Sequence, residues 1–360
     1  MNQMIENASP GLWALAWRRL RADRIAMVSL AVVILFLLSV LLSATGLVAA
    51  DWEDEVAVNY APPGFVGPDP ALAALSRPPA PTPPNAFDPL AGELAQLKTE
   101  LARHGHSAQA VKASTLPFGA DKWGHDIVKK TIKGGQTSIV VGLVAALVAV
   151  ALGTLFGAVS GFYGGKVDDL FNWFYSIFTS IPSILMILTV AAVLQTKGVL
   201  TIVLILGLTG WTGPYRLIRA EYIKHKAREY VMAADAIGAS SWRRMFSHIL
   251  PNVSHVALVQ MSILVVGFIK AEVILSFLGF GVPVGVVSWG SMLNEAQNEL
   301  ILGKWWQLAA AASAMALLVT AFSLFADALR DALEMAEDVG GRDPSITHMH
   351  SPPLLVAEVS

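Results

Sequence analysis

The chain contains no cysteine among its 360 residues, which excludes disulfides, thiol catalysis and cysteine-based zinc sites. Charge is also scarce, since Asp, Glu, Lys and Arg make up 14% of the residues, against about 25% in a typical soluble domain. The net charge of -2 is close to zero and argues against a nucleic-acid partner. Because 54% of the residues are hydrophobic, the composition predicts an integral membrane protein.

Motifs for catalysis and ligand binding are also lacking. The nearest approach to a phosphate-binding loop is FYGGKVDD (162–169), in which Val167 stands where a Ser or Thr would bind magnesium. Neither GxSxG nor HExxH occurs. The spacing of His104, His106 and His125 fits no strong metal-binding pattern. We therefore expect no catalytic residue, no metal site and no bound nucleotide in this chain.

The sequence does contain long apolar stretches that are free of charge. A helix needs roughly 20 apolar residues to cross the hydrocarbon core of a bilayer, and six intervals approach or exceed that length. We therefore predict an all-α integral membrane protein with six transmembrane helices, over residues 25–50, 134–165, 170–196, 198–215, 252–269 and 305–326.

Lysine and arginine beside the spans predict their orientation. Four arginines stand shortly before the first span, and seven basic residues separate the fourth span from the fifth; together they are 11 of the 25 Lys and Arg residues. We place both segments, and hence both termini, in the cytoplasm. The implied divisions are a cytoplasmic N-terminal segment (1–24, amphipathic over 11–20), an external loop (51–133), a core of spans two to six (134–335) and a cytoplasmic tail (336–360) expected to be poorly ordered.

The external loop is rich in proline. Ten of the 19 prolines fall between residues 62 and 89, which predicts an extended, semi-rigid run. The segment AGELAQLKTELARHG (91–105) has apolar residues at helical spacing and predicts a short amphipathic helix.

Three glycines, Gly153, Gly157 and Gly161, recur every four residues in the second predicted span. A stripe of this kind removes side chains from one helix face and lets another helix approach closely. It fits either a contact with another subunit or gate, or packing inside one bundle, and both readings stay open.

Two charges interrupt the apolar sequence FIKAEVILSFLGFG (268–281). Lys270 and Glu272 are two residues apart and would point away from each other on a helix. Charges within a membrane usually face a cavity or a partner. We expect Glu272, with Ser276 and Phe277, to line a path or its gate. The alternative is that the span ends near Phe268, so that both charges reach the headgroups.

The polar stretch EYVMAADAIGASSWRRMFSHILPN (229–252) lies between two apolar runs and predicts two short helices. Gly238 permits a turn between them, and Ser240 or Ser241 can cap the second. The first helix would present one face formed by Tyr230, Ala233, Ala234 and Ile237. The second would pack on the protein's own helix ends through Trp242, Met245, Phe246 and Ile249. Pro251 suits the first turn of the next span.

Five blocks of sequence, in order, carry a family resemblance. In the stretch just described, the Ala233–Ala234 pair, Gly238 and Leu250–Pro251 keep the spacing of the EAA loop of binding-protein-dependent ABC importer permeases. The other blocks are PFGADKWGHDIVKKTIKGGQTSIVVG (117–142), GFYGGKVDDL with IPSIL, EVILSFLGFG with SWGSML, and ADALRDALE. The chain thereby resembles the "C"-type permease subunit of the dipeptide/oligopeptide transport family. Met232 departs from the pattern, because it stands where the Glu of the EAA loop would be; Glu229 or Asp235 could substitute for it.

The resemblance implies a type I ABC importer permease fold, in which a cytoplasmic EAA coupling loop (about 220–250) docks into a groove on an ATPase subunit. Without the family, a helical hairpin lying on the membrane surface would be favoured. The ATPase-coupling residues implied are Glu229, Tyr230, Ala233, Ala234, Asp235, Gly238 and Arg243.

The resemblance also implies partners and a role. The partners are a second homologous permease, two ATP-binding subunits that carry ATP and magnesium, a periplasmic or lipid-anchored substrate-binding protein, and membrane lipid. This chain would be a non-catalytic subunit of the bacterial inner membrane and would bind no cofactor. Short peptides are the implied substrate, while nickel, glutathione or a peptide-like antibiotic stay open. The rival class is an ion-coupled secondary transporter, for which Glu272 is the one candidate carboxylate within a span.

Overall fold

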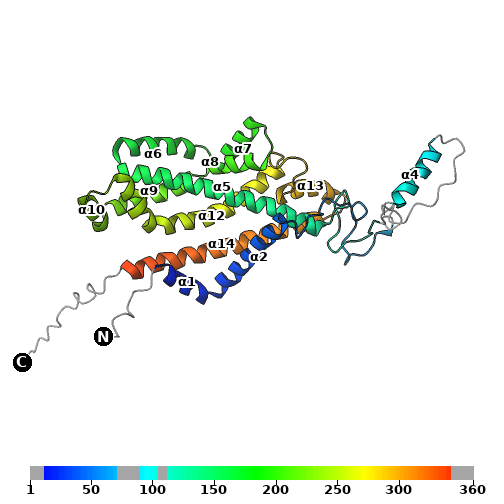
Figure 1. Cartoon of the computed structure of the whole chain (residues 1–360), viewed down its shortest axis with the longest axis horizontal. Helices are drawn as coiled ribbons and strands as arrows, with labels where there is room; N and C mark the ends of the chain where they lie inside the picture. Colours follow the sequence, from blue (N-terminus) through cyan, green and yellow to red (C-terminus); the bar gives the residue numbers. More distant parts are fainter. Residues whose placement is uncertain (1–11, 71–89, 104–111, 342–360) are drawn as a thin grey trace, which may run out of the picture.

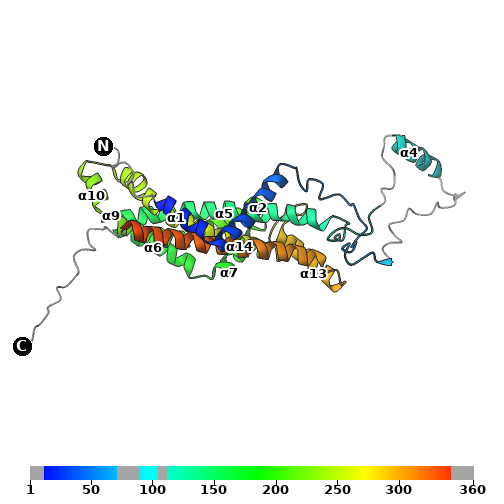
Figure 2. The same cartoon turned by 90° about the horizontal axis from the view of Figure 1, so that it is seen from below.

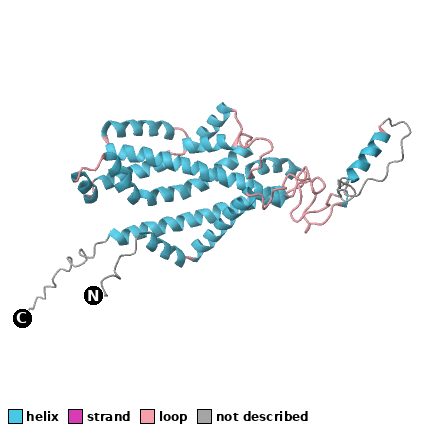
Figure 3. Cartoon of the chain, viewed as in Figure 1, coloured by secondary structure: helices cyan, strands magenta, loops and turns pink. Residues whose placement is uncertain are grey.

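The computed structural model describes residues 12–70, 90–103 and 112–341, which are mostly helical (Figure 3). Four helices are long and apolar enough to cross a membrane: α2 (Arg24–Ala44), α5 (Ile127–Tyr163), α12 (Leu250–Phe277, continuous with the short helices before it) and α14 (Trp306–Gly341). A bent pair, α6 (Gly165–Thr179) and α7 (Ser183–Leu194), gives a fifth span when counted as one. The predicted all-α membrane architecture is therefore confirmed, at four to five spans by length and composition.

The third predicted span, 170–196, is not one straight helix. Its two parts, α6 and α7, meet at an angle of 82°. The break falls at residues 180–182, and Pro182 explains it, since proline disfavours helical geometry in the residue before it and lacks a backbone N–H. The prediction of a continuous helix here is wrong.

The fourth predicted span, 198–215, is also divided. Helix α8 (Val199–Thr209) has 11 residues and is about 16 Å long at 1.5 Å per residue, too short to cross a bilayer alone. After Gly210 and Trp211 the chain continues as α9 (Thr212–Lys226), which carries basic and acidic residues. The predicted single helix is therefore wrong here as well.

Side-chain caps fix where two long helices begin. Asp23 accepts a hydrogen bond from the backbone N of Ile25 at 2.8 Å and starts α2. Asp126 accepts one from the backbone N of Val128 at 2.8 Å and starts α5, seven residues before the predicted span. Such caps satisfy the first backbone donors of a helix. Helix α2 ends at Ala44, six residues before the predicted limit.

Helix α5 lies at the centre of the bundle (Figure 1). Its buried small and branched side chains pack against α8, α12 and α14 in the main hydrophobic core. The members include Ile139, Ala145, Ala149, Leu206, Ile269 and Leu318. Because α5 is covered on several sides, it is the helix against which the others are positioned.

The glycine stripe of α5 is covered by α9 of the same chain. A Cβ on Gly153 would lie 2.6 Å from the Cβ of Pro214, and one on Gly157 would lie 2.8 Å from the carbonyl oxygen of Tyr215. A Cβ on Gly161 would lie 2.7 Å from the carbonyl oxygen of Arg219. Of the two readings of the stripe, the structure favours packing inside one bundle.

The N-terminal helix α1 (Leu12–Ala22) packs on the far part of α14. Ala16 and Leu20 form a small buried cluster there with Ala26, Ala332 and Leu333. Helix α14 runs well past the predicted limit of residue 326, to Gly341. The predicted tail 336–360 therefore begins inside a helix, and its expected poor order is wrong for residues 336–341. Residues 1–11 and 342–360 of the predicted terminal segments, and residues 71–89 of the predicted proline-rich run, lie outside the described residues.

The bundle has two distinct ends (Figures 1 and 2). One end, here the α10 end, carries α10 (Glu229–Ala236) and the short helices after it. The other, here the α13 end, carries α13 (Trp289–Ile301) and the loop segments 51–70 and 112–126. The predicted helix over 91–105 is present as α4 (Ala91–Arg103), with its last two residues outside the described part.

Candidate functional site

The α10 end forms the predicted helix–turn–helix. Helix α10 is closed by Gly238, whose φ of +83° is a conformation that residues with a Cβ resist. Ser240 then caps α11 (Ser241–Arg243) by accepting a hydrogen bond from the backbone N of Arg243 at 3.3 Å. A six-residue π-helix, η1 (Arg244–Ile249), leads into α12, where Pro251 lies in the first turn. The predicted turn, cap and proline position are confirmed.

A buried cluster holds this end onto the bundle. Val231 of α10 packs with Met245 and Ile249 of η1 against Tyr222 of α9 and the end of α5. The hydroxyl of Tyr222 donates a hydrogen bond to the carbonyl oxygen of Met245 at 3.1 Å. Helix α10 is therefore packed, through this cluster, against α9 and the end of α5.

The outer face of this end is apolar and exposed. Met232 and Trp242 are more than half exposed, and Ile237 is 84% exposed. Glu229, Tyr230, Ala233, Gly238 and Arg243 are exposed too, as a docking face requires.

Two residues differ from the sequence-based expectation. Ala234 faces inward at 5% exposure, so it cannot lie on the outer face predicted for it, because α10 turns Val231 and Ala234 toward its own bundle. Met245 and Ile249 pack inward as predicted, but Trp242 lies outside and contacts Phe246, with the rings tilted by 41° and their centroids 4.2 Å apart.

Asp235 is held by an ion pair with Arg244 across the turn. The Arg244 guanidinium also lies 5.5 Å above the ring of Phe162, at the end of α5. These contacts border a cavity of about 310 Å³ that Lys226, Met232 and Ser241 also line. Glu229 and Asp235 are the two acidic residues that could replace the missing Glu at position 232. Of these, Asp235 already forms an ion pair with Arg244 of the same chain.

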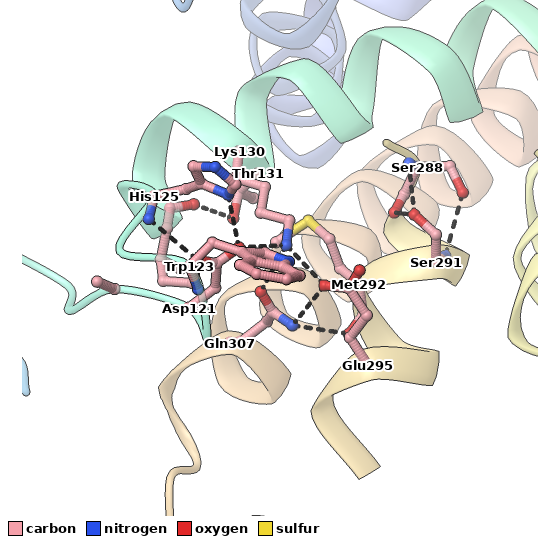
Figure 4. A network of polar contacts seen from close by, with 12 residues as sticks. Asp121, Trp123, His125, Lys130, Thr131, Ser288, Ser291, Met292, Glu295 and Gln307 are labelled. Atoms are coloured by element: carbon pink, nitrogen blue, oxygen red, sulfur yellow. Dashed lines mark hydrogen bonds and ion pairs between the residues drawn. The ribbon is translucent and has the colours of Figure 1, made fainter. Parts of the chain in front are cut away.

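A second polar constellation lies at the α13 end, around Lys130 (Figure 4). The Lys130 side chain is 5% exposed, and its Nζ donates to Oδ2 of Asp121 at 2.7 Å and to Oε2 of Glu295 at 2.7 Å. It also donates to Oε1 of Gln307 at 3.2 Å. One lysine thus ties the start of α5 to the loop segment 112–126, to α13 and to α14.

Asp121 is the most enclosed member of this network, with 0% exposure. Its Oδ1 accepts hydrogen bonds from the backbone N of Trp123 at 2.8 Å and of His125 at 3.0 Å. Burial by itself raises the pKa of Asp121, but the Lys130 ammonium and these hydrogen bonds outweigh it and hold the pKa below its ordinary value. Asp121 is therefore a structural anion that fixes the loop to α5.

Glu272 lies inside the chain's own helix junction. Helix α12 continues to Phe277, and Glu272 is 0% exposed while Lys270 points outward and is exposed. Oε1 of Glu272 accepts a hydrogen bond from Ser276 at 2.7 Å, and Oε2 has no partner among the described residues. The helix does not end near Phe268, and Glu272 is enclosed by the chain itself, so the alternative that both charges reach the headgroups does not fit Glu272. That Glu272 lines a path stays a prediction. Ser276 is buried and Phe277 half-buried, and their role in a path stays a prediction.

Two family profiles match this chain, and the first of them includes both the α10 end and α13. The sequence profile described as "binding-protein-dependent transport system inner membrane component" matches residues 153–336, about half of the chain and all of the α10 end. The chain belongs to this family. A second profile, described as the N-terminal TM domain of oligopeptide transport permease C, matches residues 11–63 of the permease.

Named relatives agree with these profiles. The permease is 34% identical over 240 residues to the dipeptide transport system permease protein DppC of Bacillus subtilis. The aligned residues cover 65% of this chain and 75% of the relative. The permease is 36% identical over 217 residues to the oligopeptide transport system permease protein OppC of the same species, covering 60% and 70%. The Lactococcus lactis DppC is 29% identical over 327 residues, which is 89% of both chains.

Glu299 of α13 is a buried acid next to the Lys130 network. It is 1% exposed, and neither of its carboxylate oxygens has a hydrogen-bond partner among the described residues. Burial raises the pKa of Glu299 from 4.5 to about 7, although the charge of Lys130 opposes the shift. Glu299 therefore titrates near neutral pH in the folded permease.

This titration predicts a pH-dependent stability. Between pH 4.5 and about 7 the folded state keeps a proton that the unfolded state releases, so the free energy of unfolding falls as pH rises through that window. The fall has an upper bound of about 3.5 kcal/mol, at about 1.4 kcal/mol for each unit of pKa. Glu299→Gln should abolish this part of the pH dependence of the unfolding midpoint in detergent. The exposed Glu53→Gln is the control, and an unchanged pH profile in Glu299→Gln would contradict the assignment.

Sequence reasoning missed the Lys130 network. Its members Asp121 and Lys130 lie within the block PFGADKWGHDIVKK, which was used only for its resemblance. A lysine four residues before the predicted apolar span, and nine residues after an aspartate, was the available signal. The other two members, Glu295 and Gln307, are 165 and 177 residues away, and nothing local pointed to them.

Proposed function

We propose that this permease is the membrane subunit of an ATP-driven importer and that the α10 end is its coupling loop. One observation carries the proposal: α10 presents an exposed apolar face while its inner face is locked to α9 and α5. A docked ATPase could bury the outer face and move the two helices together. Since Asp235 is paired with Arg244, Glu229 is the acidic residue proposed to meet the ATPase in place of the missing Glu.

The proposed topology has six spans, with α6–α7 and α8–α9 as broken spans. Broken helices are tolerated at membrane depth where other helices or a cavity surround them. Both termini and the α10 end would face the cytoplasm, and the α13 end would face outward from the bacterial inner membrane. The packing of α1, with its arginines, onto the distal part of α14 fits this orientation.

The proposed assembly contains a second homologous permease, two ATP-binding subunits and an external substrate-binding protein. ATP and magnesium would be bound by the ATP-binding subunits, and this chain would bind no cofactor. Short peptides are the proposed substrate, because the relatives are named as dipeptide and oligopeptide permeases. The alternative substrates are nickel, glutathione and peptide-like antibiotics. Mass spectrometry of the ligand held by the substrate-binding protein would distinguish them from short peptides.

Ile237→Asp tests the coupling role. The substitution changes a side chain that is 84% exposed, so the permease should still fold. If an ATPase covers this face, an aspartate would be buried in an apolar contact, and recovery of the ATP-binding subunits with the purified permease should fall roughly tenfold. Uptake should fall with it.

Ile301→Asp is the matched control, because Ile301 is 83% exposed at the α13 end. It should leave recovery of the ATP-binding subunits unchanged. If Ile237→Asp instead lowers the amount of inserted permease and spares ATPase recovery, the α10 end lies on lipid and the coupling proposal fails.

A further inference from the structure

The largest cavity described at the α13 end has a volume of about 670 Å³. We call it the outer cavity. It lies between the loop segments beside Trp52 and Trp123, the first turns of α13, and the loop 279–287 that joins α12 to α13. Its volume is within the range of about 300–1,000 Å³ that is usual for small-molecule sites.

One wall of the outer cavity carries a positioned carboxylate. Oε2 of Glu295 accepts from Nζ of Lys130 at 2.7 Å and from Nε2 of Gln307 at 3.4 Å, which fixes the side chain. The Glu295 side chain stays 31% exposed, and no hydrogen bond to its Oε1 occurs among the described residues. Lys130 is shared with the fully buried Asp121, so Glu295 contributes an uncompensated negative charge. Oε1 is therefore available to a cationic group in the cavity.

Lysines line other parts of the same cavity. Lys122 lies 5.6 Å above the ring of Trp123. Lys197, in the connection between α7 and α8, is exposed and forms no ion pair within the described part of the chain. The exposed Glu53 also lines the cavity, which thus combines the fixed carboxylate of Glu295 and this second acid with two lysines at separate positions.

The remaining lining is aromatic and aliphatic. Trp52 packs partly into the main core and contacts His125 edge-on at 6.0 Å between ring centroids. Trp123 is exposed, and the loop 279–287 adds valines, of which Val284 is fully exposed. Apolar walls with a few placed charges are typical of a site that tolerates varied side chains while fixing polar ends.

We propose that the outer cavity is a low-selectivity receiving site for short peptides with free ends. The α-amino group binds Oε1 of Glu295, the α-carboxylate binds Lys122 or Lys197, and the side chains lie against Trp52 and Trp123. The inference rests on the proposed function. In that function the α13 end faces outward from the membrane, and short peptides are the transported substrate. The inference adds a binding site on the permease itself, separate from the substrate-binding protein.

Photo-crosslinking tests the site directly. The purified assembly of permease and ATP-binding subunits is mixed with a dipeptide that carries a diazirine side chain, and the binding protein is omitted so that its selectivity cannot decide the result. Crosslinks mapped by mass spectrometry should fall on Trp52, Trp123 or the loop 279–287. N-acetylation or C-amidation of the dipeptide should each lower the yield about tenfold, because each removes one charge-assisted hydrogen bond.

Two variants address the charges one at a time. Glu295→Gln should lower the yield for the free dipeptide about tenfold and leave the N-acetylated one unaffected; glutamine can still accept from Lys130, which protects the fold. Lys197→Gln touches no part of the Lys130 network and should reduce discrimination against the amidated dipeptide. Glu55→Gln is the matched control, since Glu55 pairs with Lys112 on the surface at 2.6 Å and does not line the cavity.

The outcomes separate this inference from the proposed function. Crosslinks at other positions, or equal yields for free and blocked dipeptides, would overturn the receiving site even if ATP-driven peptide uptake by the complete transporter is intact. Failure of that uptake with every peptide would instead overturn the proposed function. Crosslinks at the predicted positions that depend on both free ends would support the site.

Discussion

Lys130→Met is expected to destabilise the folded permease by about 3–5 kcal/mol, the range for breaking a buried ion pair by removing one partner. Lys130 is 5% exposed and is the cation shared by Asp121 and Glu295. Methionine fills a similar volume but leaves Asp121, at 0% exposure, buried without its cation. The change should appear as a fall of several degrees in the midpoint of thermal unfolding of the purified permease in detergent.

The neighbouring residue supplies the control. Lys129 pairs with Asp51 at 2.5 Å, but both side chains are more than one-third exposed, so Lys129→Met should change the midpoint little. Glu295→Gln added to Lys130→Met should recover part of the loss, because it removes one of the stranded charges. Equal midpoints for the two single methionine variants would refute the assignment of a structural role to the Lys130 network.

Gly157→Leu is expected to prevent tight packing of α5 on α9, at a cost of roughly 3 kcal/mol or more. Even a Cβ at this position would lie 2.8 Å from the carbonyl oxygen of Tyr215 and 3.0 Å from the backbone N of Arg219. Backbone atoms cannot rotate away as a side chain can, so the two helices must separate. Reduced recovery of monodisperse permease from membranes and a lower unfolding midpoint would be the measured result.

Gly267→Leu provides the comparison within a helix. Gly267 lies in α12, and a Cβ there would meet nothing within 4 Å. It should therefore be tolerated, although it adds the same side chain to the same kind of element. If both substitutions are tolerated equally, the close α5–α9 contact does not limit the stability of the fold.

The sequence predicted helix ends well where the signals are local. Ser240 caps α11, and Gly238 takes the positive φ that closes α10, both as the residue types indicate. Hydrophobicity predicted the stretches that form α2 and α14 but not where those helices stop, since a helix can continue into polar sequence when a neighbour supports it. The extension of α14 to Gly341, with α1 packed on it, is an example.

The candidate sites divide in the same manner. The α10 end was predicted from a continuous stretch of sequence, and its turn and cap are confirmed. Which side of α10 faces outward was not: Ala234 points inward and Trp242 outward, because the orientation is set by the fit of Val231 onto Tyr222 and the end of α5. The outer cavity was not predicted at all, since it is assembled from loops and helix ends far apart in the chain.

The sequence by itself determined that this is a helical membrane protein and that α5 must meet another helix closely, because hydropathy, caps and glycine spacing belong to consecutive residues. Only the tertiary structure decided that the partner of the glycine stripe is α9 and that Glu272 is enclosed by its own chain. It also decided that Lys130 joins Asp121 to Glu295. The physical reason is that pairing and burial depend on which helices pack side by side, and long uniform apolar stretches specify depth in the membrane far better than they specify neighbours.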